Sequence, residues 1–210
     1  MLGLGDFVFR DGLLDFGALG GVDSGEDVGA AGKHGKQTGG SCFERRIRSC
    51  SGMQKITPFL WFDAQAEEAV GFYLSVFKGG KIYTTTRYPE NGPRPAGTVM
   101  TIAFELQGEQ FVALNGGPGF PFTNAVSLVV NCESQAEIDY YWEKLAADGG
   151  EQIQCGWLKD KFGMPWQIVP GKVWDWLGGD DPARVQRVTA AVWQMEKLDL
   201  AELERAANGG

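Results

Sequence analysis

Histidine is nearly absent from this sequence of 210 residues. Its single histidine, His34, lies in a glycine-rich stretch near the start of the chain. Histidine is the commonest protein metal ligand and the usual general base near neutral pH. Because residues 53–210 contain none, the sequence disfavours both a histidine-rich metal site and histidine-based catalysis in this part of the chain.

Other features that the sequence lacks narrow the class of protein further. It has no apolar run long enough to cross a membrane, and its net charge of −8 comes without a basic stripe that would favour nucleic acid. The four cysteines form no C-x-x-C pair, and no signal peptide is evident. Cys42 and Cys50 could pair across a short loop, but nothing requires it. We therefore expect a cytoplasmic globular protein with reduced thiols.

The first 52 residues differ in composition from the rest. They hold 13 of the 31 glycines, a density at which no helical or strand period survives. Seven acidic residues balance six basic ones there, whereas a transit peptide is poor in acidic residues. We expect residues 1–52 to be a disordered leader upstream of a natural start at Met53.

From residue 53 onward the sequence predicts one structural unit that occurs twice. In the first half, the apolar strand "KITPFLWF" precedes a helix, for which Asp63 is the predicted cap. Three further strands follow: "KIYTTTRY", "TVMTIAFELQ" and "EQFVALN". The predicted helix has one apolar stripe, formed by Ala66, Ala69, Val70, Tyr73, Val76 and Phe77.

The second half repeats this order of elements. The strand "AVSLVVNC" leads into a helix whose start, Ser134 to Glu137, is a capping box. Strands near 151–154, 155–160 and 164–169 follow. The halves match at an offset of 70 residues around each helix and at 55 where Gly108 meets Gly163. The pattern predicts an α+β fold of paired βαβββ modules over 53–170.

Residues 171–210 lie outside this repeat and predict a C-terminal helical extension. Asp181 and Pro182 are typical of a helix start, and Asp199 begins a last short helix. These helices either cover their own sheet or cross to a second subunit.

Several stretches resemble one known family. They are "ITPFLWF", "AEEAVGFY", "FVALNGGPGFPF", "AVSLVVNCESQAEIDYYWEKL", "CGWLKDKFGMPWQIVP" and "DPARVQRVTAAVWQMEKLDLAELERA". Together they resemble the PhnB-like family, labelled the 3-demethylubiquinone-9 3-methyltransferase domain, of the vicinal oxygen chelate (glyoxalase/bleomycin-resistance) superfamily. The resemblance covers residues 53–208. It implies that the two modules form a cupped mixed sheet with a ligand site inside the cup.

In metal-dependent members of the superfamily, four ligands, typically histidine and glutamate, converge in that cup. The resemblance places them near Lys55 or Ile56, near Val112 or Ala113, near Ala125, and at Gln167. None of these residues is a good ligand for a divalent ion, because Gln167 offers only a neutral amide oxygen. We interpret the nearby carboxylates Asp160 and Glu105 as turn or surface charges. We therefore expect no metal and no cofactor.

The methyltransferase label has little support in the residues. S-adenosylmethionine-dependent methyl transfer usually relies on a glycine-rich turn between a strand and a helix. Here the glycine-rich segment Asn115–Phe120 contains a proline and links the two modules.

Residues suited to a small-molecule pocket are present in both modules. Trp61 and Trp157 offer flat apolar surfaces, Asn115, Ser127 and Gln167 offer neutral hydrogen bonds, and Cys155 opens a strand toward the cup. Strand alternation places Gln167 on one face and Trp166 on the helix-covered face. Cys132 sits beside a helix start, which either lowers the pKa of its thiol or leaves it a small buried apolar residue.

Three functions remain open. The sequence best supports a metal-free homodimeric protein that binds a small, largely neutral or aromatic molecule in its cup. The alternatives are an enzyme (a metal-dependent lyase, isomerase or dioxygenase, or the methyltransferase of the family label) and a dimeric structural or regulatory protein without a pocket.

Overall fold

The first module lies at the start of the described part of the chain. The computed structural model describes residues 54–210, so the expected leader at 1–52 and the expected start at Met53 lie outside the described residues. The module follows the predicted order: β1 (Phe59–Phe62), α1 (Ala66–Val76), β2 (Lys81–Arg87), β3 (Val99–Leu106) and β4 (Glu109–Asn115).

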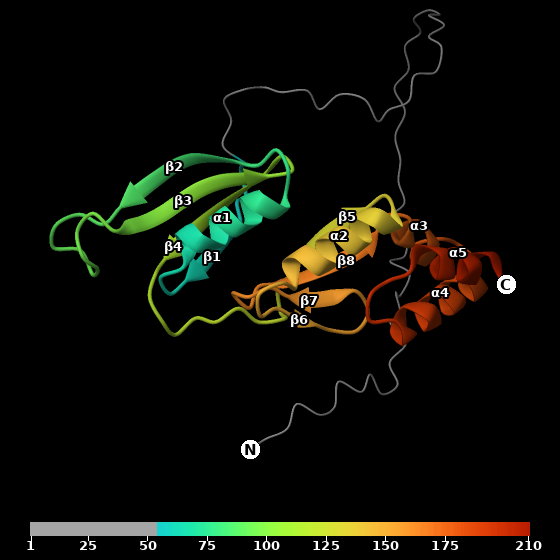
Figure 1. The fold of residues 1–210 in the computed structure, drawn as a ribbon. Helices are drawn as coiled ribbons and strands as arrows, with labels where there is room; N and C mark the ends of the chain where they lie inside the picture. Colours follow the sequence, from blue (N-terminus) through green and yellow to red (C-terminus); the bar gives the residue numbers. More distant parts are fainter. Residues whose placement is uncertain (1–53) are drawn as a thin grey trace, which may run out of the picture. The chain divides into compact units, whose positions relative to one another are not determined.

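These strands form a four-stranded sheet in the order β1-β4-β3-β2. Strand β1 runs parallel to β4 with Phe59 opposite Val112, and β3 and β4 form an antiparallel hairpin. Helix α1 covers one face of this sheet (Figure 1). All six residues of its predicted apolar stripe are buried, which confirms the periodicity seen in the sequence.

The second module repeats this arrangement with shorter strands. Its sheet has the order β5-β8-β7-β6, again with the first strand parallel to the last. The Ser134 hydroxyl accepts a hydrogen bond from the Glu137 amide at 3.3 Å, as the capping box predicts. The elements are β5 (Leu128–Cys132), α2 (Gln135–Leu145), β6 (Glu151–Gln152), β7 (Trp157–Lys159) and β8 (Pro165–Pro170).

The paired βαβββ prediction is therefore confirmed, and the fold class is α+β, as expected. Hydrogen bonds define two separate four-stranded sheets rather than one continuous sheet. Strand β2 is exposed along its whole length, so one edge of the first sheet remains open within the described chain.

Three C-terminal helices follow: α3 (Val173–Leu177), α4 (Pro182–Gln194) and α5 (Leu200–Asn208). Asp181 and Asp199 cap α4 and α5 as predicted, whereas α3 was not predicted. The helices form an apolar cluster with Val169 of β8, so they pack against their own second sheet. None of the helices in residues 54–210 combines the length and the apolar character needed to cross a membrane.

The two modules share one hydrophobic core, and both lie in a single compact unit. The ring of Phe77 on the loop after α1 stacks on Tyr141 at 5.1 Å and on Trp166 at 5.4 Å. Tyr140 also donates a hydrogen bond to the Val76 carbonyl at 2.9 Å. The helix-covered sides of the modules are thus joined by aromatic side chains.

Asp160 begins a turn, since its carbonyl accepts a hydrogen bond from the Gly163 amide at 2.8 Å, but it lies in the shared core and is not a surface charge. The residue is 2% exposed. Its carboxylate accepts hydrogen bonds from Tyr73 Oη at 2.8 Å, from Trp166 Nε1 at 2.9 Å, and from the amides of Phe162 and Met164. Burial raises the pKa of Asp160, and these four hydrogen bonds oppose the rise. Tyr73 belongs to the first module, so Asp160 joins the modules through a buried polar contact.

Candidate functional site

The face of the second sheet that points away from α2 carries three of the predicted site residues. Along β8, Trp166 is buried in the core while Gln167 is half-exposed on the other face, which confirms the predicted alternation. Gln167 lies between Val129 of β5 and Trp157 of β7 in the strand register. Val129 is 40% exposed, so this face is open to solvent.

Ser127 and Gln167 form a neutral polar pair on this face. Gln167 Nε2 donates to Ser127 Oγ at 2.8 Å. No residue in the described range donates to Gln167 Oε1, and the Ser127 hydroxyl keeps its own hydrogen available. The pair therefore offers an acceptor, Gln167 Oε1, and two donors, the second Nε2 hydrogen and the Ser127 hydroxyl, beside the half-buried ring of Trp157. Such a surface suits an uncharged ligand with both a donor and an acceptor.

The C-terminal helices border the same face at the far end of its strands. Trp174 of α3 donates from Nε1 to Asn131 Oδ1 at 2.8 Å, and its side chain is half-exposed. Cys155 precedes β7 with a left-handed φ of 63°, and its amide donates to the Met195 carbonyl at 2.7 Å. Burial raises the pKa of the Cys155 thiol. Cys155 thus lies where this face meets the helices, as a neutral thiol.

Cys132 is not an activated thiol. Its side chain is buried, and burial together with the charge of Glu137 raises its pKa to about 12. The nearby N-terminus of α2 at Ser134 does not lower the thiol pKa enough to offset burial and the charge of Glu137. Of the two alternatives for Cys132, the small buried apolar residue is correct.

Asn115 lies in the first module, and its amide is fully engaged there. It is buried, and its Oδ1 accepts from the Ala66 amide at 2.8 Å, which caps α1 from the end of β4. Its Nδ2 donates to Glu67 and to the Val99 carbonyl. The predicted cap by Asp63 is wrong, since Asp63 instead pairs with Arg94 at 2.9 Å. Asn115 therefore keeps no free amide hydrogen for a ligand.

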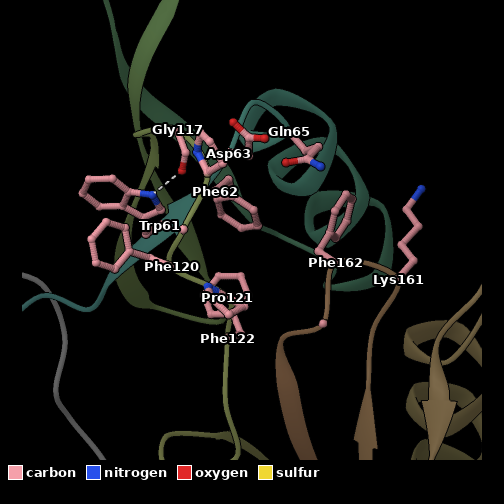
Figure 2. Close-up of a pocket in the computed structure, with 13 residues that line it drawn as sticks. Trp61, Phe62, Asp63, Gln65, Gly117, Phe120, Pro121, Phe122, Lys161 and Phe162 are labelled. Atoms are coloured by element: carbon pink, nitrogen blue, oxygen red, sulfur yellow. Dashed lines mark hydrogen bonds between the residues drawn. The ribbon is translucent and has the colours of Figure 1, made fainter. Parts of the chain in front are cut away.

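Trp61 also lies in the first module, at a separate hollow of about 390 Å³ (Figure 2). Its indole crosses Gly116, where an added Cβ would meet the ring at 2.3 Å, so only glycine fits there. Trp61 Nε1 donates to the Gly117 carbonyl at 2.8 Å, and Phe120 packs edge-on against the ring at 4.9 Å. The linker between the modules is thereby fixed against β1.

The sequence did not predict that this hollow exists. Its walls come from the end of β1, the linker Gly117–Phe122 and the turn Lys161–Gly163. The run "GFPF" within the linker, two phenylalanines around a proline, is the signal that would have marked the linker as more than a connection. The structure thus groups Ser127, Trp157 and Gln167 on one face and places Trp61 at another site.

The described residues do not fit the metal site that the resemblance described above would imply. Within residues 54–210, no three side chains among histidine, cysteine, aspartate and glutamate come together as metal ligands would. At the expected ligand position, Gln167 presents an amide already bound to Ser127. We therefore derive no chemical step through a metal.

Fold and site together define a two-module α+β protein with an uncharged, partly aromatic sheet face. The family model of the 3-demethylubiquinone-9 3-methyltransferases matches residues 54–169. The chain belongs to this PhnB-like family.

Several solved structures are similar to this chain. The PhnB protein from Bacillus cereus is 42% identical, with a TM-score of 0.51, and the match covers 56% of this chain and 99% of that one. A Pseudomonas aeruginosa protein is 23% identical (TM-score 0.46; coverage 56% and 98%). The fosfomycin resistance protein FosX from Listeria monocytogenes, whose structure holds Mn(II) and sulfate, is 14% identical (TM-score 0.41; coverage 62% and 98%). No curated protein matches this chain.

Proposed function

We propose that this protein binds a small, uncharged molecule on the outward face of its second sheet, without a catalytic metal. The observation that carries the proposal is the Gln167–Ser127 pair, whose unused acceptor and two unused donors lie beside Trp157. An aromatic surface with a few fixed neutral polar groups is the usual composition of a small-molecule site.

The charges near this face support an uncharged ligand. Lys159, on the same face of β7 as Trp157, is paired with Glu151 at 3.0 Å. Both Cys155 and Cys132 hold their protons because burial raises their pKa values. No free charge from these groups is available to attract a charged ligand, so recognition depends on shape and neutral hydrogen bonds.

The alternative of methyl transfer gains no support from the linker. The glycine-rich segment Asn115–Phe120 runs from β4 into the linker and does not lead into a helix. It therefore lacks the helix N-terminus that normally follows a glycine-rich loop and contacts the bound cofactor.

A screen of small neutral compounds by thermal shift tests the proposal. Any ligand that binds only the folded state raises the melting temperature with concentration. A compound so found should lose its effect in Gln167→Ala and in Trp157→Ala, and keep it in the matched control Gln107→Ala on the β3–β4 turn. A compound that acts equally on all three variants places the ligand elsewhere. A tightly held stoichiometric metal, measured by elemental analysis of the purified protein, contradicts the metal-free part of the proposal.

We also propose that a second copy of the chain covers β2, the exposed edge strand of the first sheet. Ile82 and Tyr83, neighbours on β2, are 50% and 46% exposed. Exposed apolar side chains on the unpaired edge of a sheet are typical of an interface. Sedimentation equilibrium should give twice the chain mass, and Ile82→Lys should shift the protein toward the monomer.

A further inference from the structure

The hollow at Trp61 has aromatic walls on opposing sides. Trp61 and Phe120 form one wall, and Phe62 and Phe162 lie across from them in Figure 2. Phe62 is held in place by edge contacts with Phe122 at 5.3 Å and with Phe162 at 6.0 Å. Fixed aromatic rings on several sides favour a flat ring as occupant, because stacked and edge-on pairs gain most with another aromatic group.

The charges at its rim are already neutralised. Asp63 pairs with Arg94 at 2.9 Å, and Lys161 pairs with Glu68 at 2.8 Å. The Lys161 ammonium also lies 5.2 Å from the centre of the Phe162 ring. A charged occupant would have to break these contacts or remain unpaired near apolar walls, which is costly. The rim therefore selects an uncharged molecule.

The linker supplies hydrogen-bond donors that the described chain does not use. Within residues 54–210, no hydrogen bond involves the backbone N–H of Gly119, Phe120 or Phe122. Pro118 and Pro121, which also line the hollow, have no N–H. A ligand oxygen, as in a carbonyl or an ether, is the group that complements such donors.

From these three observations we propose that the hollow at Trp61 binds an uncharged planar aromatic molecule that carries a carbonyl or ether oxygen. The site is distinct from the sheet face of the proposed function, because none of Ser127, Trp157 and Gln167 lines it. Its walls come from both modules. The occupant therefore binds only while the Lys161–Gly163 turn stays against the linker, and it raises the stability of the joined modules.

Fluorine NMR of the full-length chain labelled with fluorotryptophan tests this inference, with coumarin as the probe. The Trp61 signal is assigned from its loss in Trp61→Phe. Coumarin should shift this signal saturably, while its carboxylate derivative, a matched ring with one negative charge, should bind about tenfold more weakly.

Phe120 provides the variant and Phe59 its matched control. Both phenylalanines are largely exposed, at 66% and 57%, so neither substitution should unfold the protein, and Phe59 does not line the hollow. Phe120→Ala should weaken coumarin about fivefold, the range that an aromatic pair contributes, and Phe59→Ala should leave the affinity unchanged.

Two results would overturn the inference. One is a Trp61 signal that does not move up to the solubility limit of coumarin. The other is equal affinity in Phe120→Ala and Phe59→Ala. If coumarin shifts only the Trp157 signal, the ligand binds the sheet face, and this inference fails while the proposed function stands.

Discussion

The two modules share one order of elements but complete their structures by different means. The first has long strands, with seven, eight and seven residues in β2, β3 and β4. The second has only two and three residues in β6 and β7, and the C-terminal helices pack against its sheet through Val169. In the described chain the first sheet has no such cover, and β2 is exposed throughout. One chain plan thus has its sheet covered by the chain's own extension in the second module and leaves the edge strand β2 exposed in the first.

The two modules also differ in how the first turn of their helix is capped. Helix α2 is capped by Ser134 of its own first turn, whereas α1 is capped by Asn115, 49 residues further along the chain. Local and distant caps therefore serve equivalent positions of the two modules. The first module depends more on its assembled sheet for the start of its helix.

The largest expected effect comes from breaking the link between the modules. Asp160→Ala leaves four buried donors without an acceptor and should lower the free energy of unfolding by about 3 kcal/mol or more. Tyr73→Phe removes one of these hydrogen bonds and should cost about 1 kcal/mol. Urea unfolding measures both. The control Asp180→Ala, at an exposed residue, should change little, and an equally small effect of Asp160→Ala would contradict the link.

Removal of the distant cap should have the next largest effect. Asn115→Ala leaves the Ala66 amide and the Val99 carbonyl unpaired in a buried site, so we expect a loss of about 2 kcal/mol. Hydrogen exchange should show the first turn of α1 opening more readily than the second module. Uniform protection of both modules would count against this role of Asn115.

The local cap should matter less. Ser134→Ala removes a single, partly solvated hydrogen bond, and we expect a loss of about 1 kcal/mol in the same urea assay. If Ser134→Ala proves as harmful as Asn115→Ala, the contrast between a local and a distant cap does not hold.

The smallest expected effect is a change of stability with pH. Because burial raises the pKa of Asp160 in the folded state, the folded protein holds this proton more tightly than the unfolded chain. This contribution to stability is complete below the unfolded pKa of about 3.9 and is lost as pH rises through the folded pKa. As the pH rises from about 4, the native protein should therefore lose stability relative to the Asp160→Asn variant. If the native protein instead gained stability relative to Asp160→Asn over this range, the four hydrogen bonds would lower the pKa of Asp160 by more than burial raises it.

Much of the fold could be predicted because its signals are local. The apolar stripe of α1, the alternation of Trp166 and Gln167, and the caps Ser134, Asp181 and Asp199 each depend on residues within a few positions. The errors concern contacts between distant residues. The turn at Asp160 was predicted but its burial was not, because its partner Tyr73 is 87 residues away. Asp63 was preferred as a cap because Asn115 is far from α1 in sequence.

The candidate site also has parts that the sequence predicted and parts that it did not. Strand alternation placed Gln167 on the outward face, and the register adds Trp157 and Val129 beside it. The roles of these residues in ligand binding remain predictions. The hollow at Trp61 could not be predicted, because three segments from both modules must meet to form it.

By itself, the sequence determined the duplicated βαβββ plan and the lack of histidine beyond residue 53, since spacing and composition suffice for both. Its motifs also resemble those of the family that the family model confirms. Only the tertiary structure decided that Asp160 is a buried link, that Asn115 starts a helix, and that the linker encloses an aromatic hollow. The physical reason is that burial and hydrogen-bond partners are set by which surfaces meet, and here those surfaces lie dozens of residues apart.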